Sequence, residues 1–121
     1  MMESQGLLAP ESYWTLHEDE KYEITNGCGP ARATSLVPNT IMGVNIRAAC
    51  DIHDYTYAQP ETVKSREEAD FLFSYNMRRL VDRKLDPGFF RSLAYFGVNL
   101  YLMAVRLFGG KYFNGQKITY H

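Results

Sequence analysis

Four residues in the middle of the chain combine side chains that could carry out acid–base chemistry. Cys50, His53, Asp54 and Tyr57 follow one another at intervals of three, one and three residues. In a helix this spacing places all four along one stripe. A packed core rarely requires a thiol, an imidazole, a carboxylate and a phenol together. The pattern therefore predicts a functional site if the segment is helical and faces inward.

A further carboxylate, Asp70, falls on the apolar stripe of the next expected helix. The apolar members of that stripe are Ala69, Phe73, Met77, Leu80 and Val81. A buried carboxylate is costly unless it is paired, and a histidine on an adjacent antiparallel helix would satisfy it. A His53–Asp70 hydrogen bond would fix the imidazole tautomer and stabilise the imidazolium. In the alternative, Asp70 lies at the edge of the stripe and is hydrated near the helix N-terminus.

The elements that would position these residues make the fold class mainly α. The first long helix is expected over residues 45–58, with Asn45 as its N-cap. The second is expected over residues 65–84, because Ser65 opens a capping-box pattern. The connection between them is short, so the two helices should pack as antiparallel neighbours. A third, C-terminal helix should begin at Asp86-Pro87 and end at Gly109-Gly110.

Less regular segments surround these helices. Residues 1–24 have a mixed pattern, with one short helix expected near residues 12–16. Residues 25–44 are dense in Gly, Pro and Asn and are expected to form a long loop. Residues 112–120 place an Asn-Gly pair between aromatic and β-branched residues, which indicates a small β-hairpin.

Length and composition fit one domain over residues 1–121, with 45% hydrophobic and 22% charged residues. The formal net charge of −1 gives no basis for nucleic-acid binding. The first residues contain no recognisable signal peptide. The apolar run over residues 93–105 is too short for a transmembrane segment. We interpret it as a core helix, with a helix lying on a membrane surface as the alternative.

The carboxylate of Asp54 should point away from the partner of His53, because neighbouring helical side chains diverge by about 100°. Its expected direction is toward the preceding glycine-rich loop. There the carbonyls of Gly27, Gly29 and Ala31 alternate along the chain. A hard carboxylate facing backbone carbonyls outlines a Ca²⁺ site.

The combination of these motifs resembles the secreted phospholipase A2 superfamily, in its disulfide-poor bacterial and fungal branch. Cys50, His53, Asp54 and Tyr57 match the helix motif of the family, and Cys28-Gly29 resembles the start of its calcium loop. The Ala69-Asp70 pair resembles the opening of the family's second long helix. The resemblance covers about residues 26–77, and residues from Asp86 onward contribute no motif to it. Pro30-Ala31 and the scarcity of cysteines depart from most members of the family.

The resemblance implies calcium-dependent hydrolysis of a fatty-acyl ester of glycerophospholipids, with a phospholipid or membrane surface as the substrate. By it, His53 is the general base that deprotonates a water, Asp70 orients His53, and Tyr57 hydrogen-bonds Asp70. Asp54 and the carbonyls of Gly27, Gly29 and Ala31 would bind Ca²⁺.

The two cysteines leave other interpretations open. A disulfide between Cys28 and Cys50 would tie the loop to the helix and would suggest a secreted or exported protein. Reduced thiols would instead favour a small structural zinc module held by Cys28, Cys50, His53 and Asp54. A catalytically silent relative that acts as a binding protein or toxin is a further alternative.

Overall fold

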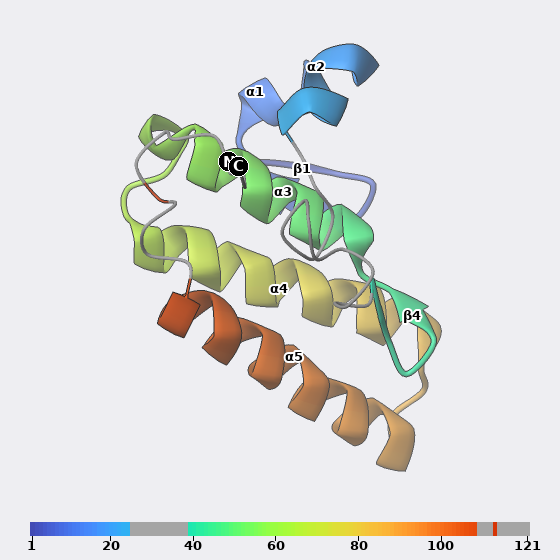
Figure 1. The fold of residues 1–121 in the computed structure, drawn as a ribbon. Helices are drawn as coiled ribbons and strands as arrows, with labels where there is room; N and C mark the ends of the chain where they lie inside the picture. Colours follow the sequence, from blue (N-terminus) through green and yellow to red (C-terminus); the bar gives the residue numbers. More distant parts are fainter. Residues whose placement is uncertain (25–38, 109–112, 114–121) are drawn as a thin grey trace.

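The computed structural model describes residues 1–24, 39–108 and 113, and it confirms a mainly helical fold (Figure 1). The helices and strands, in chain order, are β1 (Met2–Ser4), β2 (Leu7–Ala9), α1 (Glu11–Trp14), α2 (Glu18–Ile24), β3 (Thr40–Ile41), β4 (Val44–Asn45), α3 (Arg47–Ala58), the short 3-10 helix η1 (Pro60–Thr62), α4 (Arg66–Lys84) and α5 (Phe89–Phe108). Figure 1 shows α3, α4 and α5 in succession, each antiparallel to the one before, with η1 in the connection between α3 and α4. The expected antiparallel pair of long helices is therefore confirmed.

Helix α3 starts slightly later than the sequence predicts. Its N-cap is Ile46, which provides no capping side chain. Asn45 was expected at this position, but it pairs with Thr40 in the β3–β4 hairpin. Its side chain still accepts a hydrogen bond from the Arg47 N–H at 2.9 Å. The Asn45 side chain thus still accepts from the first turn of α3, although it lies one residue before the N-cap.

Helix α4 follows its sequence prediction closely. The Ser65 hydroxyl accepts a hydrogen bond from the Glu68 N–H at 3.1 Å, as a capping box requires. The reciprocal bond is displaced by one residue, because the Glu68 carboxylate accepts from the Lys64 N–H at 3.3 Å. Four members of its apolar stripe are buried, and Leu80 packs against them partly buried. The buried members are Ala69, Phe73, Met77 and Val81.

Helix α5 differs from its prediction at its start and in the face that it buries. It begins at Phe89, because Pro87 and Gly88 form a turn in which Gly88 has φ of +148°. The interpretation of residues 93–105 as a core helix is wrong for most of the large side chains. Over residues 89–107 of α5, only Ala94 and Val98 are fully buried. Among the described helices, none combines the length and hydropathy needed to cross a membrane.

Two small antiparallel hairpins were not expected from the sequence. The β1–β2 hairpin turns at Gln5-Gly6, and the β3–β4 hairpin turns at Met42-Gly43. All four turn residues have positive φ, between 51° and 79°. This is the geometry of a type I′ turn, which suits a two-residue hairpin loop. The prediction of a loop over residues 25–44 is thus wrong at its end, where β3 and β4 form a hairpin. The hairpin expected over residues 112–120 lies outside the described residues apart from Phe113.

The core consists of two clusters on either side of the α3–α4 pair. The larger one joins α3 and α4 to the β3–β4 hairpin and α5, and it contains Ile41, Val44, Ile46, Ala49, Cys50, Phe73, Met77, Val81, Ala94 and Val98. The smaller one joins α3 and α4 to the N-terminal hairpin and α1, and it contains Leu7, Ala9, Tyr13, Ile52, Tyr55 and Leu72. Helices α3 and α4 therefore pack on both sides, which holds their mutual orientation.

The N-terminal hairpin is fastened to α4 by polar side chains. The carboxamide of Asn76 accepts from the Leu8 N–H and donates to the Leu8 carbonyl, both at 2.8 Å. Arg79 donates to the Gly6 carbonyl at 3.1 Å, and Arg83 donates to the Gln5 carbonyl at 2.9 Å.

Candidate active site

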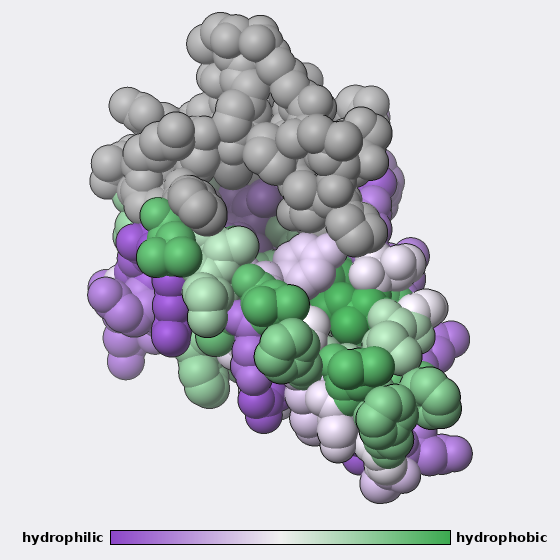
Figure 2. Space-filling model, turned by 60° about the horizontal axis from the view of Figure 1, so that its bottom comes forward, coloured by the Kyte–Doolittle hydropathy of each residue, from purple (hydrophilic) through white to green (hydrophobic). Residues whose placement is uncertain are grey.

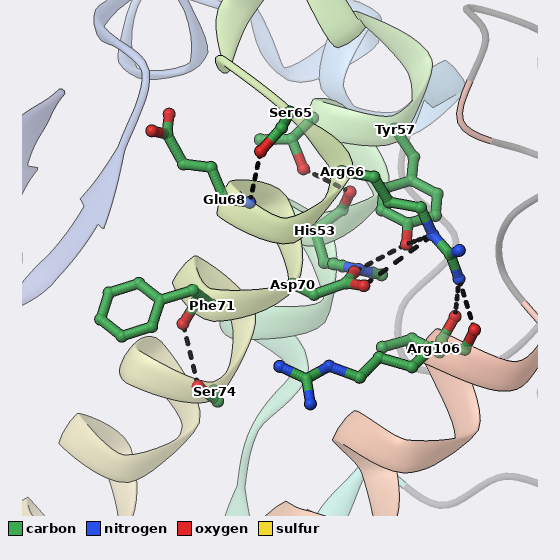
Figure 3. A network of polar contacts seen from close by, with 11 residues as sticks. His53, Tyr57, Ser65, Arg66, Glu68, Asp70, Phe71, Ser74 and Arg106 are labelled. Carbon is green, nitrogen blue, oxygen red and sulfur yellow. Dashed lines mark hydrogen bonds and ion pairs between the residues drawn. The ribbon is translucent and has the colours of Figure 1, made fainter.

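The imidazole of His53 and the carboxylate of Asp70 meet between α3 and α4. His53 Nε2 lies 2.9 Å from Asp70 Oδ1, so the expected hydrogen bond is confirmed. His53 is 7% exposed and Asp70 is 2% exposed. The hydrated, helix-edge alternative for Asp70 is therefore wrong. Figure 3 shows the two side chains reaching toward each other from the two helices.

Tyr57 completes this pair from one turn further along α3. Its hydroxyl donates to the same Asp70 Oδ1 at 2.6 Å, as the resemblance implied. Its ring centroid lies 4.3 Å from that of His53, and the Phe73 ring stacks on His53 at 4.4 Å with an interplanar angle of 25°. The imidazole is thus flanked by two rings and held in plane by a carboxylate. Such packing fixes the direction in which its second nitrogen, Nδ1, points.

The surroundings set the protonation state of the pair. Burial lowers the pKa of His53 below its ordinary value of 6.5, and the hydrogen bond to Asp70 opposes this shift without cancelling it. Burial alone would raise the pKa of Asp70, but the hydrogen bonds from His53 and Tyr57 hold it below its ordinary value of 3.8. At neutral pH the pair therefore consists of a neutral imidazole and a carboxylate.

These protonation states determine which nitrogen of His53 can act as a base. An ionised carboxylate only accepts hydrogen bonds, so the proton between His53 and Asp70 belongs to Nε2. The lone pair is then on Nδ1, which has no hydrogen-bond partner among the described residues. A neutral histidine in this tautomer can accept a proton from a water at Nδ1, and Asp70 stabilises the imidazolium that results.

Arg66 is a member of this network that the sequence analysis missed. Its Nε donates to the Tyr57 hydroxyl at 3.0 Å and lies 3.9 Å from Asp70 Oδ2. Its Nη2 donates to the carbonyls of Val105 and Arg106, both at 2.7 Å. These carbonyls belong to the last turn of α5, where backbone acceptors lack intrahelical partners. One guanidinium thus connects the end of α5 to the residues that hold His53 (Figure 3).

One sequence signal points to Arg66. It lies four residues before Asp70, at the spacing of a helical ion pair. The signal does not reveal the backbone carbonyls of α5, because any residue type can present a carbonyl.

The structure places part of the expected metal site. Asp54 is buried, at 8% exposed. The pKa of Tyr13 is raised mainly by burial, and the nearby negative charges of Asp51, Glu18 and Asp54 raise it further. Gly27, Gly29 and Ala31, the other expected ligands, lie outside the described residues. Within residues 1–24 and 39–108, no group of three or more His, Cys, Asp or Glu side chains is arranged to hold a metal.

Of the two cysteines, only Cys50 lies among the described residues. Cys50 is 2% exposed and is not a free thiol. Cys28 lies outside the described residues. Because Asp70 occupies Nε2 of His53, only Nδ1 of that ring could bind a metal. The zinc module therefore gains no support from the described contacts of these residues.

Comparison with known proteins adds no family or neighbour. Neither a scan against protein-family models nor searches of curated proteins and solved structures give a match to this chain.

Proposed function

We propose that this protein is a calcium-dependent, phospholipase A2-like hydrolase that cleaves a fatty-acyl ester of glycerophospholipids. The observation that carries the proposal is the His53–Asp70–Tyr57 arrangement. It presents a neutral, oriented imidazole whose free lone pair is on Nδ1. The resemblance of the sequence motifs to secreted phospholipases A2 supplies the substrate class and the metal.

The proposed reaction begins when a water donates a proton to Nδ1 of His53 as its oxygen attacks the ester carbonyl carbon. The Asp70 carboxylate stabilises the imidazolium through the Nε2 proton, and Tyr57 keeps that carboxylate in place. The tetrahedral intermediate then expels the glycerol oxygen, which takes the proton back from Nδ1. The products are a fatty acid and a lysophospholipid, and His53 returns to its neutral form.

The donor chemistry of the expected metal site suits Ca²⁺. Asp54 contributes a carboxylate from the helical position next to His53, and the loop carbonyls of Gly27, Gly29 and Ala31 would contribute the remaining oxygens. When bound, the ion would polarise the ester carbonyl and stabilise the negative charge that develops on its oxygen. Backbone carbonyls and one carboxylate are ligands that favour calcium over zinc.

The test is hydrolysis of a defined glycerophospholipid, with the fatty acid and lysophospholipid both identified by mass spectrometry. We expect turnover with Ca²⁺, none with EGTA, and a loss of about 100-fold or more in the His53→Gln variant. The His17→Gln variant is the matched control, because His17 is exposed and outside the site. Turnover that persists in EGTA or in the His53→Gln variant would contradict the mechanism. An absence of turnover in the wild type would favour the catalytically silent binding protein.

A further inference from the structure

Helix α5 exposes a continuous stripe of large apolar side chains. The stripe, which we call the α5 apolar stripe, consists of Phe89, Leu93, Phe96, Leu100, Met103 and Leu107, with Phe90 beside its first turn. These residues are between 42% and 73% exposed, and the stripe members recur at alternating intervals of four and three residues. Figure 2 shows apolar side chains gathered on the visible face of the molecule. Apolar patches of this extent usually mark an interaction surface.

The opposite face of α5 explains why the large residues point outward. Its two fully buried positions, Ala94 and Val98, are small, and Tyr95, Tyr101 and Val105 pack against the core partly buried. At Gly97 an added Cβ would lie 2.8 Å from Ile41 Cγ2, so this position admits no side chain without a shift. The helix therefore lies close to the β3–β4 hairpin through small residues. Close packing through small residues leaves the Phe, Leu and Met side chains of the stripe outside the core, where they can contact an external apolar partner.

The polar residues beside the stripe indicate the kind of partner. One edge carries Ser92, Asn99 and Arg106, all exposed, and α5 contains no acidic residue. Paired copies of such a helix would normally flank the seam with opposite charges, which hold the register. This edge offers only uncharged groups and one cation. An apolar face rich in Phe and Leu, with a cation at its margin, suits a phospholipid surface.

The position of the stripe relative to the candidate site is a second, independent observation. The stripe runs to Leu107, and the carbonyls of Val105 and Arg106 in the same turn accept hydrogen bonds from Arg66. Arg66 also donates to Tyr57, which holds Asp70. The guanidinium of Arg66 thus links the C-terminal end of the stripe directly to the residues that orient His53 (Figure 3).

We propose that the α5 apolar stripe is the face by which this protein docks on a phospholipid surface. The inference rests on the proposed function, because it identifies where the chain meets the aggregated form of its substrate. The stripe lies along the surface, and its C-terminal end positions the His53 site beside the lipid layer.

The test is co-sedimentation of the full chain with vesicles of phosphatidylcholine and phosphatidylglycerol in EGTA, so that turnover plays no part. The variant combines Phe96→Ser, Leu100→Ser and Met103→Ser in the exposed middle of the stripe. We expect its vesicle partition coefficient to fall by about 100-fold relative to the wild type. Phe71→Ser is the matched control, because Phe71 is 62% exposed on α4 and outside the stripe; its partition coefficient should equal that of the wild type.

Circular dichroism checks that each variant keeps its helical signal. If the triple variant unfolds, the three single-substitution variants are measured in its place. Wild-type protein that does not bind vesicles overturns the proposal, as do variants that bind like the wild type. Sedimentation velocity tests the alternative that a second copy of the chain binds the stripe. A wild-type dimer that the substitutions dissociate, without vesicle binding, would assign the stripe to a second copy of the chain.

Hydrolysis of a dispersed short-chain phospholipid by the wild type separates this proposal from the proposed function. Vesicle binding without hydrolysis rejects the enzyme and retains the docking face. Hydrolysis of the dispersed substrate without vesicle binding rejects the docking face and retains the enzyme.

Discussion

Replacing Asp70 by Asn should lower the pKa of His53 further, and this expectation follows from the contacts of the pair. The substitution keeps the size of the side chain and removes its charge. In the native protein burial lowers the pKa of His53, while the hydrogen bond and charge of Asp70 raise it. Without the carboxylate, burial acts almost unopposed, so the imidazole should hold a proton only at a lower pH than in the wild type.

The stability cost can be estimated from the two bonds that Asp70 Oδ1 accepts, at 2.9 Å from His53 and 2.6 Å from Tyr57. A hydrogen bond to a charged group contributes about 1.5–3 kcal/mol, and a neutral one about 0.5–1.5 kcal/mol. Weakening both bonds by about 1 kcal/mol each lowers the free energy of unfolding by about 2 kcal/mol. For a chain of this length we expect the Tm to fall by about 8 °C.

The assay is an NMR titration of the His53 ring protons, assigned by comparison with the His53→Gln variant, together with thermal unfolding. Asp86→Asn is the matched control, because it makes the same charge change at an exposed residue and should leave the His53 titration in place. A His53 pKa that stays the same or rises in Asp70→Asn would refute the assignment of an ionised Asp70 paired with a neutral imidazole. This test requires no substrate, so its result does not depend on the proposed activity.

Three further expectations follow from the same network. Tyr57→Phe removes the 2.6 Å bond to Asp70 and leaves Arg66 Nε without its 3.0 Å acceptor, so chemical denaturation should show a loss of about 1.5–3 kcal/mol; an unchanged unfolding midpoint would contradict this. Arg66→Lys keeps the charge but cannot bridge the Tyr57 hydroxyl and two α5 carbonyls, so we expect about 1–2 kcal/mol of destabilisation. We also expect the acid limb of the pH–rate profile to move. A purely structural contribution of Arg66 would lower the Tm and leave that limb in place. Stability should also decrease in acid, because the folded pKa of His53 is lowered: the unfolded chain takes up a proton as the pH falls below about 6.5 while the folded protein does not. Asp70, whose folded pKa is lowered too, adds a second loss below about pH 4, and unfolding free energies measured from pH 8 to pH 3 should show both losses; stability that rises below pH 6 would contradict the lowered pKa of His53.

The central contact could be predicted because helical spacing and a short connection constrain it. His53 and Asp70 face each other once residues 45–58 and 65–84 are taken as antiparallel neighbours, and the charge on an apolar stripe marks the partner. Arg66 could not be assigned in the same way. Its acceptors are backbone carbonyls about 40 residues away, and these are set by where α5 ends and not by residue type.

The misassigned parts of the fold have two different physical reasons. The two hairpins have strands of two or three residues, too short to show alternation, and their turns place Gln5 and Met42 at positive φ, which these residue types seldom adopt. The following Gly6 and Gly43 were the available signals. For α5, periodicity identified the helix but not its buried face, because the choice depends on small residues such as Gly97 fitting against a neighbour.

The attachment of the N-terminal hairpin to α4 has a consequence for the order of events during synthesis. Asn76 binds Leu8 across 68 positions of the chain, and Arg83 binds Gln5 across 78. The first ten residues therefore leave the ribosome long before the groups that fasten them exist, and an isolated two-stranded hairpin is marginal in water. At translation rates of about 5–20 residues per second, this end of the chain waits for several seconds before it can dock. The β1–β2 hairpin can thus reach its native position only after most of α4 has been made.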